Sequence, residues 1–330
     1  MKVVIVGGVA GGATAAARLH RLDEQAQIVV FERSGYMSYA NCGLPYYIGD
    51  VITDPAELTL QTPQSFFSRF RVDMHVHHEV LRIDADNKQV LVKNLQTGEE
   101  FLESYDKLIL SPGAKPTQPK VPGAGLARVF ALRTVEDTFK IKKFIKNHSP
   151  KTAILAGGGF IGLEMAENLK QQGVEVTVVQ RPLQVMKPFD SDMASFIHTE
   201  LRKQGVNLLL GRTVEGFVPT PNGVEVLLKD QPSLQADMVV LAIGVTPEST
   251  LAKQAGLALG LKDSILVNEH MQTSHPDIYA VGDAVQVKNY VTREDTLIPL
   301  AGPANKQGRI AADHICGIQS SYKGSRAAAC

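Results

Sequence analysis

A glycine-rich turn between a buried strand and a helix occurs twice in this chain and constrains its fold more than any other feature. The first copy runs from the apolar strand 3–6 through the turn 7–12 into the small-residue helix 13–22. A second strand, 28–31, follows and ends at Glu32, twenty residues after the last glycine of the turn. In such a βαβ unit the glycines let the backbone approach a pyrophosphate, and the acid binds the ribose hydroxyls.

The second copy begins about 150 residues later and is complete, with strand 153–156, turn 157–162, helix 163–172 and strand 174–179. The first turn departs from the G-x-G-x-x-G pattern only in that Val9 stands at its second glycine. The repetition predicts two dinucleotides and an α/β fold with two Rossmann-like domains.

The second unit lacks the terminal acid, because Gln180 and Arg181 stand in its place. Without a carboxylate to repel a ribose 2′-phosphate, and with a guanidinium nearby, this unit would tolerate NADPH as well as NADH. Arg181 as a solvated surface charge is an equal alternative.

Composition excludes several classes of protein. The 34 basic and 34 acidic side chains balance, which disfavours a nucleic-acid or acidic-membrane surface. Three scattered cysteines in 330 residues make no disulfide framework and favour a reducing, cytoplasmic setting. No apolar run reaches membrane-spanning length, and the apolar start 2–6 is too short for a signal sequence.

One cysteine lies in a distinctive stretch, residues 38–47, which reads Ser-Tyr-Ala-Asn-Cys-Gly-Leu-Pro-Tyr-Tyr. Pro45 suits the first turn of a helix. Cys42 would then lie at a helix N-terminus, where unpaired N–H groups and the helix dipole favour a thiolate. Cys42 is therefore either a redox thiol beside a bound cofactor or a buried cysteine that packs as a small hydrophobe. The nucleotide units favour the redox thiol.

Three later segments could contact a cofactor. The turn 111–113 (Ser-Pro-Gly) ends a strand, and Asp283 follows an apolar strand where it could bind a ribityl chain or cap a helix. The N-terminus of the predicted helix 300–316 could stabilise an anionic flavin. We also expect an antiparallel piece over 73–103 and a strand over 266–271.

These motifs together resemble the FAD-dependent pyridine nucleotide–disulfide oxidoreductases. Residues 38–47 are most similar to the coenzyme A-disulfide reductases and the NAD(P)H-dependent persulfide reductases. The resemblance implies an enzyme in which NAD(P)H reduces FAD, and two electrons then reduce a disulfide between Cys42 and coenzyme A, or a persulfide. Neither Met37 nor Tyr47 supplies a second cysteine, so Cys42 must pair with a sulfur or oxygen outside the polypeptide.

Two alternatives stay open. An NADH oxidase or peroxidase would cycle Cys42 through a sulfenic acid, although those enzymes commonly carry a histidine where this chain has Ala10. A flavin-binding fragment without catalysis belongs to another class.

The resemblance implies three sets of contacts. The FAD contacts are Gly7, Gly8, Val9, Ala10, Gly11, Gly12, Glu32, Arg33, Val80, Ser111, Pro112, Gly113, Arg133, Asp283 and Ala301. The nicotinamide dinucleotide contacts are Gly157, Gly159, Phe160, Ile161, Gly162, Glu164, Gln180, Arg181 and Gly244. The coenzyme A contacts are Thr14, Arg18, Arg21, Ser38, Asn41, Arg71 and Asn305. Positions 14, 18 and 21 share one helical face, where two guanidiniums suit phosphates or are simply solvated.

The resemblance also implies the order of domains. An FAD-binding domain comprises 1–118 and 249–320, and an NAD(P)-binding domain, 119–248, is inserted within it. Residues 321–330 would begin a dimerisation domain, so a full-length parent would be a homodimer.

Overall fold

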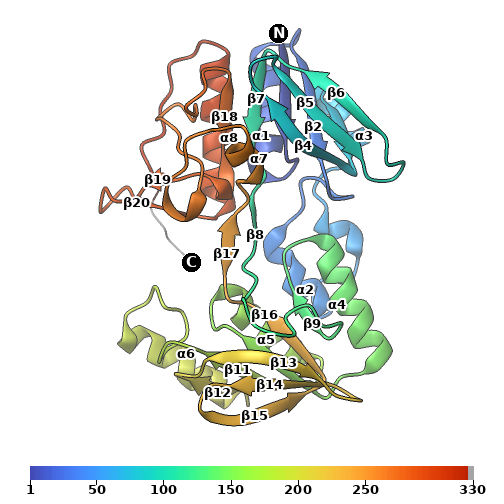
Figure 1. Ribbon diagram of the computed structural model, residues 1–330, viewed down its shortest axis with the longest axis vertical. Helices are drawn as coiled ribbons and strands as arrows, with labels where there is room; N and C mark the ends of the chain where they lie inside the picture. The colour runs from blue at the N-terminus through green and yellow to red at the C-terminus, as the bar shows by residue number, and fades with distance from the viewer. Residues whose placement is uncertain (326–330) are drawn as a thin grey trace. The chain divides into compact units, whose positions relative to one another are not determined.

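The computed structural model describes residues 1–325, which form two compact units (Figure 1). The first unit comprises Met1–Tyr39, Thr59–Lys115 and the chain from Thr246 onward. The second unit comprises Ala40–Leu58 and Pro116–Val245. The predicted start of a dimerisation domain, 321–330, falls partly outside the described residues, as does Cys330.

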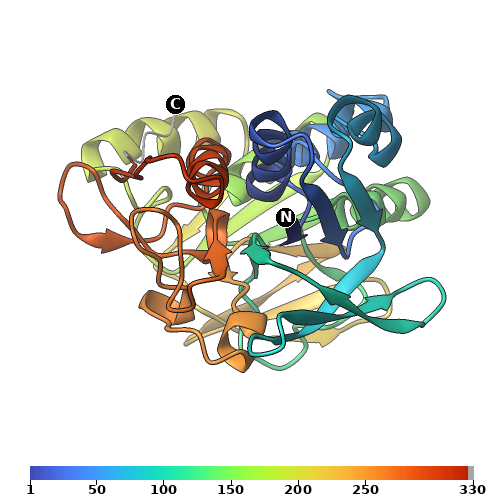
Figure 2. The same ribbon diagram turned by 90° about the horizontal axis from the view of Figure 1, so that it is seen from above.

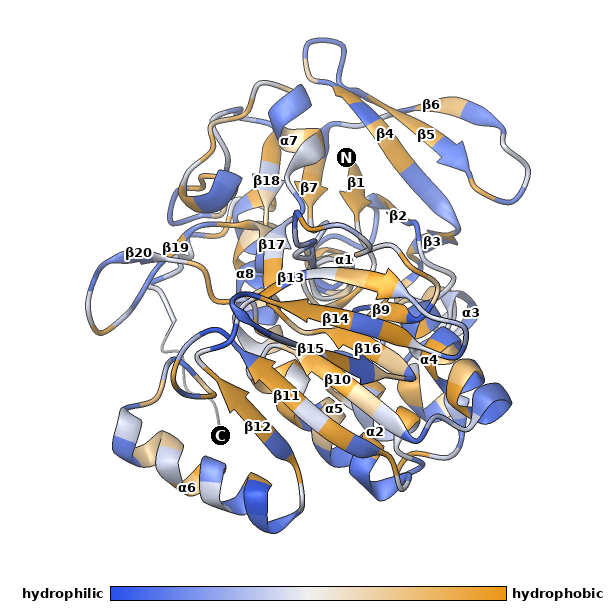
Figure 3. Ribbon diagram, turned by 60° about the horizontal axis from the view of Figure 1, so that its bottom comes forward, coloured by the Kyte–Doolittle hydropathy of each residue, from blue (hydrophilic) through white to orange (hydrophobic). Residues whose placement is uncertain are grey.

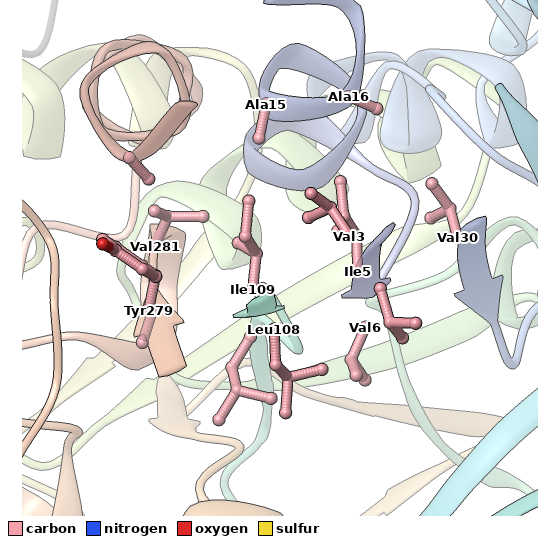
Figure 4. Packing of buried hydrophobic residues seen from close by; sticks show 14 of the residues in the cluster. Val3, Ile5, Val6, Ala15, Ala16, Val30, Leu108, Ile109, Tyr279 and Val281 are labelled. Carbon is pink, nitrogen blue, oxygen red and sulfur yellow. The ribbon is translucent and has the colours of Figure 1, made fainter. Parts of the chain in front are cut away.

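The first unit is built on a five-stranded parallel sheet with the order β18-β7-β1-β2-β3. Its strands are β1 (Lys2–Val6), β2 (Gln27–Glu32), β3 (Asp73–Val76), β7 (Lys107–Leu110) and β18 (Ile278–Ala280). Figure 4 shows the centre of this sheet, where Val3, Ile5 and Ile109 are fully buried. Strands covered on both faces explain the continuous apolar runs of the sequence.

Helices α1 (Ala10–Leu22) and α8 (Ala301–Ile315) lie side by side in the first unit (Figure 2). Their close approach depends on glycine, because a Cβ at Gly308 would lie 2.4 Å from the carbonyl oxygen of Gly11. The hydroxyl of Thr14 also donates a hydrogen bond to Oδ1 of Asn305 over 2.9 Å. Helices α3 (Pro63–Phe70) and α7 (Thr250–Gln254) belong to the same unit.

The second unit repeats the parallel sheet with the order β12-β11-β10-β16-β9. Its strands are β9 (Val129–Ala131), β10 (Thr152–Ala156), β11 (Glu175–Gln180), β12 (Asn207–Leu210) and β16 (Met238–Leu241). The strands carry largely hydrophobic colours in Figure 3. The helices of this unit are α2 (Leu44–Ile48), α4 (Val135–His148), α5 (Phe160–Gln171) and α6 (Ser191–Lys203).

The duplication extends well beyond the glycine turns. Each unit places a three-stranded antiparallel sheet between the third strand of its βαβαβ run and the strand that returns beside the first. These sheets are β4 (His78–Asp84), β5 (Gln89–Asn94) and β6 (Glu100–Ser104), and β13 (Val214–Pro219), β14 (Val224–Leu228) and β15 (Gln231–Ala236). The short strands β8 (Ala114–Pro116) and β17 (Val245–Pro247) pair with each other, as do β19 (Val287–Lys288) and β20 (Asp295–Thr296). The predicted α/β class with two Rossmann-like domains is confirmed.

Three sequence-based expectations are wrong in detail. Residues 73–76 join the parallel sheet beside β2 instead of the antiparallel piece, since Met74 faces the main core. Residues 266–271 form no strand, although Ile265 and Gln272 on either side of them make isolated bridges. Helices α1 and α5 begin at Ala10 and Phe160 instead of residues 13 and 163, because the last glycines of each turn already belong to the helix.

Candidate functional site

The first glycine turn has the geometry of a phosphate cradle. Gly7 has φ +99°, and a Cβ there would lie 2.1 Å from the carbonyl oxygen of Ser111, so only glycine fits. A Cβ at Gly12 would lie 1.9 Å from the carbonyl oxygen of Gly7. The backbone N–H of Gly8 donates to Oε2 of Glu32 over 2.7 Å, and that of Ser34 donates to Oε1 over 2.8 Å. The buried Glu32 thus fixes the turn from the end of β2.

A cavity of about 280 Å³ opens at the carboxyl ends of β1 and β2. Its lining residues are Val6, Gly7, Phe31, Glu32, Arg33, His78, Glu79, Val80, Leu81, Pro112, Lys115, Glu248, Thr250, Leu251 and Gln254. Five of the predicted FAD contacts are among them, brought together from four separate parts of the sequence. This is the edge where parallel α/β sheets bind ligands, and the volume is near the lower end of the roughly 300–1,000 Å³ typical of ligand pockets.

The rim of this cavity carries a charge network that the sequence did not reveal. Glu248 accepts from Lys115 over 3.1 Å and lies 3.9 Å from Arg33. Burial opposes ionisation, but hydrogen bonds from Thr250 and Lys115 and the nearby charges hold the pKa of Glu248 below its usual value. The only feature of the sequence that pointed to Glu248 is its position directly after a short strand at the linker.

The second glycine turn repeats this geometry with an amide in place of the acid. Gly157 has φ +118°, and a Cβ at Gly162 would lie 2.1 Å from the Gly157 oxygen. The N–H of Gly158 donates to Oε1 of Gln180 over 3.0 Å. A Cβ at Gly159 would meet no described atom within 4 Å, so the backbone is open there to an approaching phosphate.

The helices that follow both turns begin without a side-chain cap. Neither Val9 before α1 nor Gly159 before α5 offers a side-chain hydrogen bond to the first N–H groups. By contrast, α3 and α4 begin with complete capping boxes at Thr62 and Thr134. Uncapped N–H groups at a helix N-terminus bind anions. The two turns therefore fit the pyrophosphates of two dinucleotides.

The predicted residues around the nicotinamide lie at the start of α5. Phe160 is the first residue of the helix and is 47% exposed. Glu164 is one turn further along, and burial, together with the charge of Glu167, raises its pKa. Gly244 has φ +102° and has no described neighbour within 4 Å of a Cβ position.

Cys42 is exposed in the short turn Asn41–Gly43, immediately before α2. Pro45 occupies the first turn of that helix, as predicted. The exposure excludes the interpretation of Cys42 as a buried core residue. Burial raises the pKa of Tyr46, with further contributions from Glu164, Glu167 and Cys42, which shows that these groups are neighbours within the second unit. Among the described residues, Oδ1 of Asn41 is buried without a hydrogen-bond partner, so this turn retains an unused acceptor on the residue before Cys42.

The predicted coenzyme A contacts on α1 and α8 already have partners within the first unit. Nε of Arg18 lies 2.7 Å from Oδ1 of Asp313 on α8, and the guanidinium of Arg21 lies 5.1 Å from the ring centre of Phe70. Thr14 contacts Asn305 as described above. The structure thus brings Thr14 and Asn305 together but directs the two arginines to different partners.

The remaining predicted contacts lie at the ends of strands and helices. Asp283 lies half-buried in the turn Gly282–Ala284 after β18. The backbone N–H of Arg133 donates to Asp137 in the first turn of α4. Arg71 ends α3 with φ +49° and places its guanidinium 5.8 Å from the ring centre of Phe67.

No helix among the described residues is long and apolar enough to cross a membrane.

Comparison with known proteins decides the family. A family model described as pyridine nucleotide-disulphide oxidoreductase matches residues 1–308. The chain belongs to this family. The family implies FAD and a pyridine nucleotide as cofactors, in agreement with the two glycine turns.

Individual relatives of this oxidoreductase carry different names. An NADH oxidase of Methanocaldococcus jannaschii is 36% identical over 323 residues, covering 98% of this chain and 71% of that protein. A coenzyme A disulfide reductase of Staphylococcus aureus is 36% identical over 316 residues, covering 96% and 70%. The crystal structure of reduced Bacillus anthracis CoADR-RHD has a TM-score of 0.95 and 51% identity, and covers 98% of this chain. The chain spans 58% of the length of that solved structure.

Proposed function

We propose that this oxidoreductase uses FAD and NAD(P)H to reduce coenzyme A disulfide, or a coenzyme A or small-molecule persulfide, through the single thiol of Cys42. The observation that carries the proposal is the exposed Cys42 at a helix start, in a chain with two dinucleotide cradles. The names of the S. aureus relative and of the B. anthracis structure support coenzyme A as the substrate.

The cofactors would occupy one cradle each. In the first unit, Gly7, Glu32 and the cavity with Val80 and Pro112 would hold FAD. In the second unit, Gly159 and Gln180 would hold the nicotinamide dinucleotide. When both cofactors are bound, NAD(P)H supplies two electrons as a hydride.

The chain's own chemistry is then thiol–disulfide exchange at Sγ of Cys42. The thiolate attacks one sulfur of the disulfide, which releases one coenzyme A thiolate and leaves a mixed disulfide on Cys42. The released thiolate takes a proton from solvent. Cleavage of the mixed disulfide to the Cys42 thiolate and the second thiol needs two electrons, which the bound cofactors would supply, and one proton from solvent.

The proposed chemistry fits one cellular compartment. A disulfide-exchange thiol that is restored by NAD(P)H fits a reducing cytoplasm, where thiolates stay available. We propose a homodimer for a protein of the length of the matched relatives, and sedimentation of such a protein tests it.

The test compares Cys42→Ser with Cys316→Ser, the other cysteine among the described residues, which is half-buried at the end of α8. We expect Cys42→Ser to keep FAD and nicotinamide binding and to lose turnover of coenzyme A disulfide and persulfide. Cys316→Ser should keep both. Substantial turnover by Cys42→Ser would refute the role of this thiol.

A second candidate is NADH oxidase or peroxidase activity, which the name of the M. jannaschii relative favours. In that reaction Cys42 would alternate between thiolate and sulfenic acid. An anaerobic NADH titration with and without coenzyme A disulfide, followed by oxygen uptake, separates the two. Oxygen or peroxide consumption that needs no coenzyme A would favour the oxidase. Flavin binding without either turnover would leave a binding protein.

A further inference from the structure

The loop that follows the second cradle is held in one conformation by its own hydrogen bonds. This segment, residues 181–190 (the 181–190 loop), connects β11 to α6. Its middle residues Val185 and Met186 are buried, whereas Arg181 and Lys187 are exposed. A loop whose buried centre lies between two cationic residues places those charges at defined points, provided that the centre stays fixed.

The loop is attached directly to the glycine turn. The N–H of Met186 donates to the carbonyl oxygen of Gly158 over 2.8 Å, and Met186 adopts a left-handed conformation with φ +49°. A Cβ at Gly158 would lie 2.8 Å from Cγ1 of Val185. The centre of the loop and the phosphate turn therefore form one packed piece.

Two glutamines connect the loop to the end of β11. Nε2 of Gln180, whose oxygen holds Gly158, donates to the carbonyl oxygen of Gln184 over 3.2 Å. Nε2 of Gln184 donates to the carbonyl oxygen of Phe189 over 2.8 Å. The hydrogen bonds thus run without a break from the glycine turn to the far end of the loop.

One histidine on α6 satisfies the buried N–H at the loop's centre. The backbone N–H of Val185 donates to Nε2 of His198 over 3.1 Å. Nε2 can accept only when it carries no proton, so the ring is neutral with its hydrogen on Nδ1. Burial and the charge of Arg202 lower the pKa of His198, which favours the same neutral form. A buried N–H that loses its acceptor costs free energy, so the loop depends on this ring.

We propose that His198 is a positioning residue which, by fixing Val185, places Arg181 and Lys187 to receive the ribose 2′-phosphate of NADPH. The inference rests on the proposed function of the second unit as the NAD(P)H-binding unit. Release of the loop at Val185 leaves the hydrogen bond between Gly158 and Gln180 in place, so the glycine turn can still bind the pyrophosphate. The loss should therefore fall on NADPH and spare NADH.

The test uses variants that differ in where they offer an acceptor. His198→Gln places an oxygen close to the position of Nε2, His198→Asn ends about one methylene short, and His198→Leu has no acceptor. Isothermal titration at pH 8 measures the binding of NADPH, NADH and adenosine 2′,5′-bisphosphate to the purified protein. For His198→Leu and His198→Asn we expect about tenfold weaker binding of NADPH and of the bisphosphate, less than twofold for NADH, and an unchanged kcat at saturating NADH. His198→Gln should bind as the parent does.

Hydrogen exchange at the Val185 amide gives a second measurement that is independent of activity. Exchange should accelerate in His198→Leu and His198→Asn but not in His198→Gln. Equal weakening of NADH and NADPH, or parent-like NADPH binding by His198→Asn despite faster exchange, would overturn the positioning role. If the unsubstituted protein binds neither nucleotide, the proposed function is overturned, and this inference falls with it. The Gln and Asn pair decides the matter should His198→Leu fail to fold.

Discussion

The side-chain oxygen of Gln180 accepts a hydrogen bond from the N–H of Gly158 over 3.0 Å. Glu32 makes the corresponding contact with Gly8 over 2.7 Å in the first unit. The two cradles therefore share one supporting contact, and they differ in the charge that it brings. A neutral amide at the end of β11 removes the repulsion that a ribose 2′-phosphate would meet at a carboxylate.

Exchange of this charge should alter the nucleotide preference. Gln180→Glu keeps the oxygen that holds Gly158 and adds a negative charge, so we expect weaker NADPH binding with NADH binding retained. Arg181→Ala should weaken NADPH about tenfold more than NADH, which corresponds to about 1.4 kcal/mol for one charged contact. Isothermal titration with both nucleotides measures each effect. Equal losses for both nucleotides in Arg181→Ala would identify Arg181 as a solvated surface charge.

Substitution of the two arginines of α1 should affect coenzyme A substrates selectively. We expect Arg18→Ala with Arg21→Ala to raise KM for coenzyme A disulfide and to spare kcat, because phosphates bind far from the sulfur. Small persulfides without the nucleotide should be reduced as before, and added salt should weaken only the coenzyme A reaction.

The structure supplies the control for this variant. Arg18 pairs with Asp313. Removal of Arg18 therefore leaves the carboxylate of Asp313, which would itself repel phosphate. A triple variant that also carries Asp313→Asn removes that repulsion. A rise in KM that disappears in the triple variant would mean that the arginines neutralise Asp313 and do not bind the substrate.

Neutralisation of Glu164 should stabilise the protein at high pH. Burial and Glu167 raise the pKa of Glu164 above its ordinary value, so its ionisation costs more in the folded state than in the unfolded state. That cost is absent below about pH 4.3, the unfolded value, and grows as pH rises through the raised pKa. Glu164→Gln should therefore raise Tm at pH 8 and leave it unchanged at pH 3.5. Glu175→Gln, at an exposed position on β11, is the control; a gain at both pH values would contradict the electrostatic cause.

A methyl group at Gly308 should separate α1 from α8. Its Cβ would lie 2.4 Å from the carbonyl oxygen of Gly11, and overpacking of this kind costs about 1–3 kcal/mol. We expect Gly308→Ala to lower the free energy of unfolding by that amount, which is measured as a lower urea midpoint. Gly125→Ala, where a Cβ meets no described atom within 4 Å, should be nearly neutral. An unchanged midpoint in Gly308→Ala would show that the helices can move apart at little cost.

Local patterns in the sequence predicted the repeated units because their physical causes are local. Tight turns that admit only glycine, such as Gly7 and Gly157, and the apolar strands before them determine where each βαβ unit begins. The start of α1 was misjudged because glycine is a poor helix former in isolation, whereas Gly11 and Gly12 are selected here for close packing.

Contacts between distant segments could not be predicted from such patterns. Arg18 and Asp313 are 295 residues apart, and their pairing depends on α8 returning to the side of α1. The same holds for Glu248, which reaches the cavity only because the chain re-enters the first unit after Val245. The alternation of 73–76 suited either kind of sheet, and only packing against β2 decided it.

The left-handed residue Met186 has a counterpart in the first unit. Ser38 has φ +45°, and its N–H donates to the carbonyl oxygen of Gly8 over 3.0 Å, as that of Met186 does to Gly158. Both residues follow a strand of a βαβ unit and bind the second residue of its glycine turn, so they lie at equivalent places in the two units. The loop that leads to Cys42 and the loop that His198 holds are therefore structural counterparts. Under the proposed function, one counterpart would carry the redox thiol and the other would distinguish between the two nucleotides.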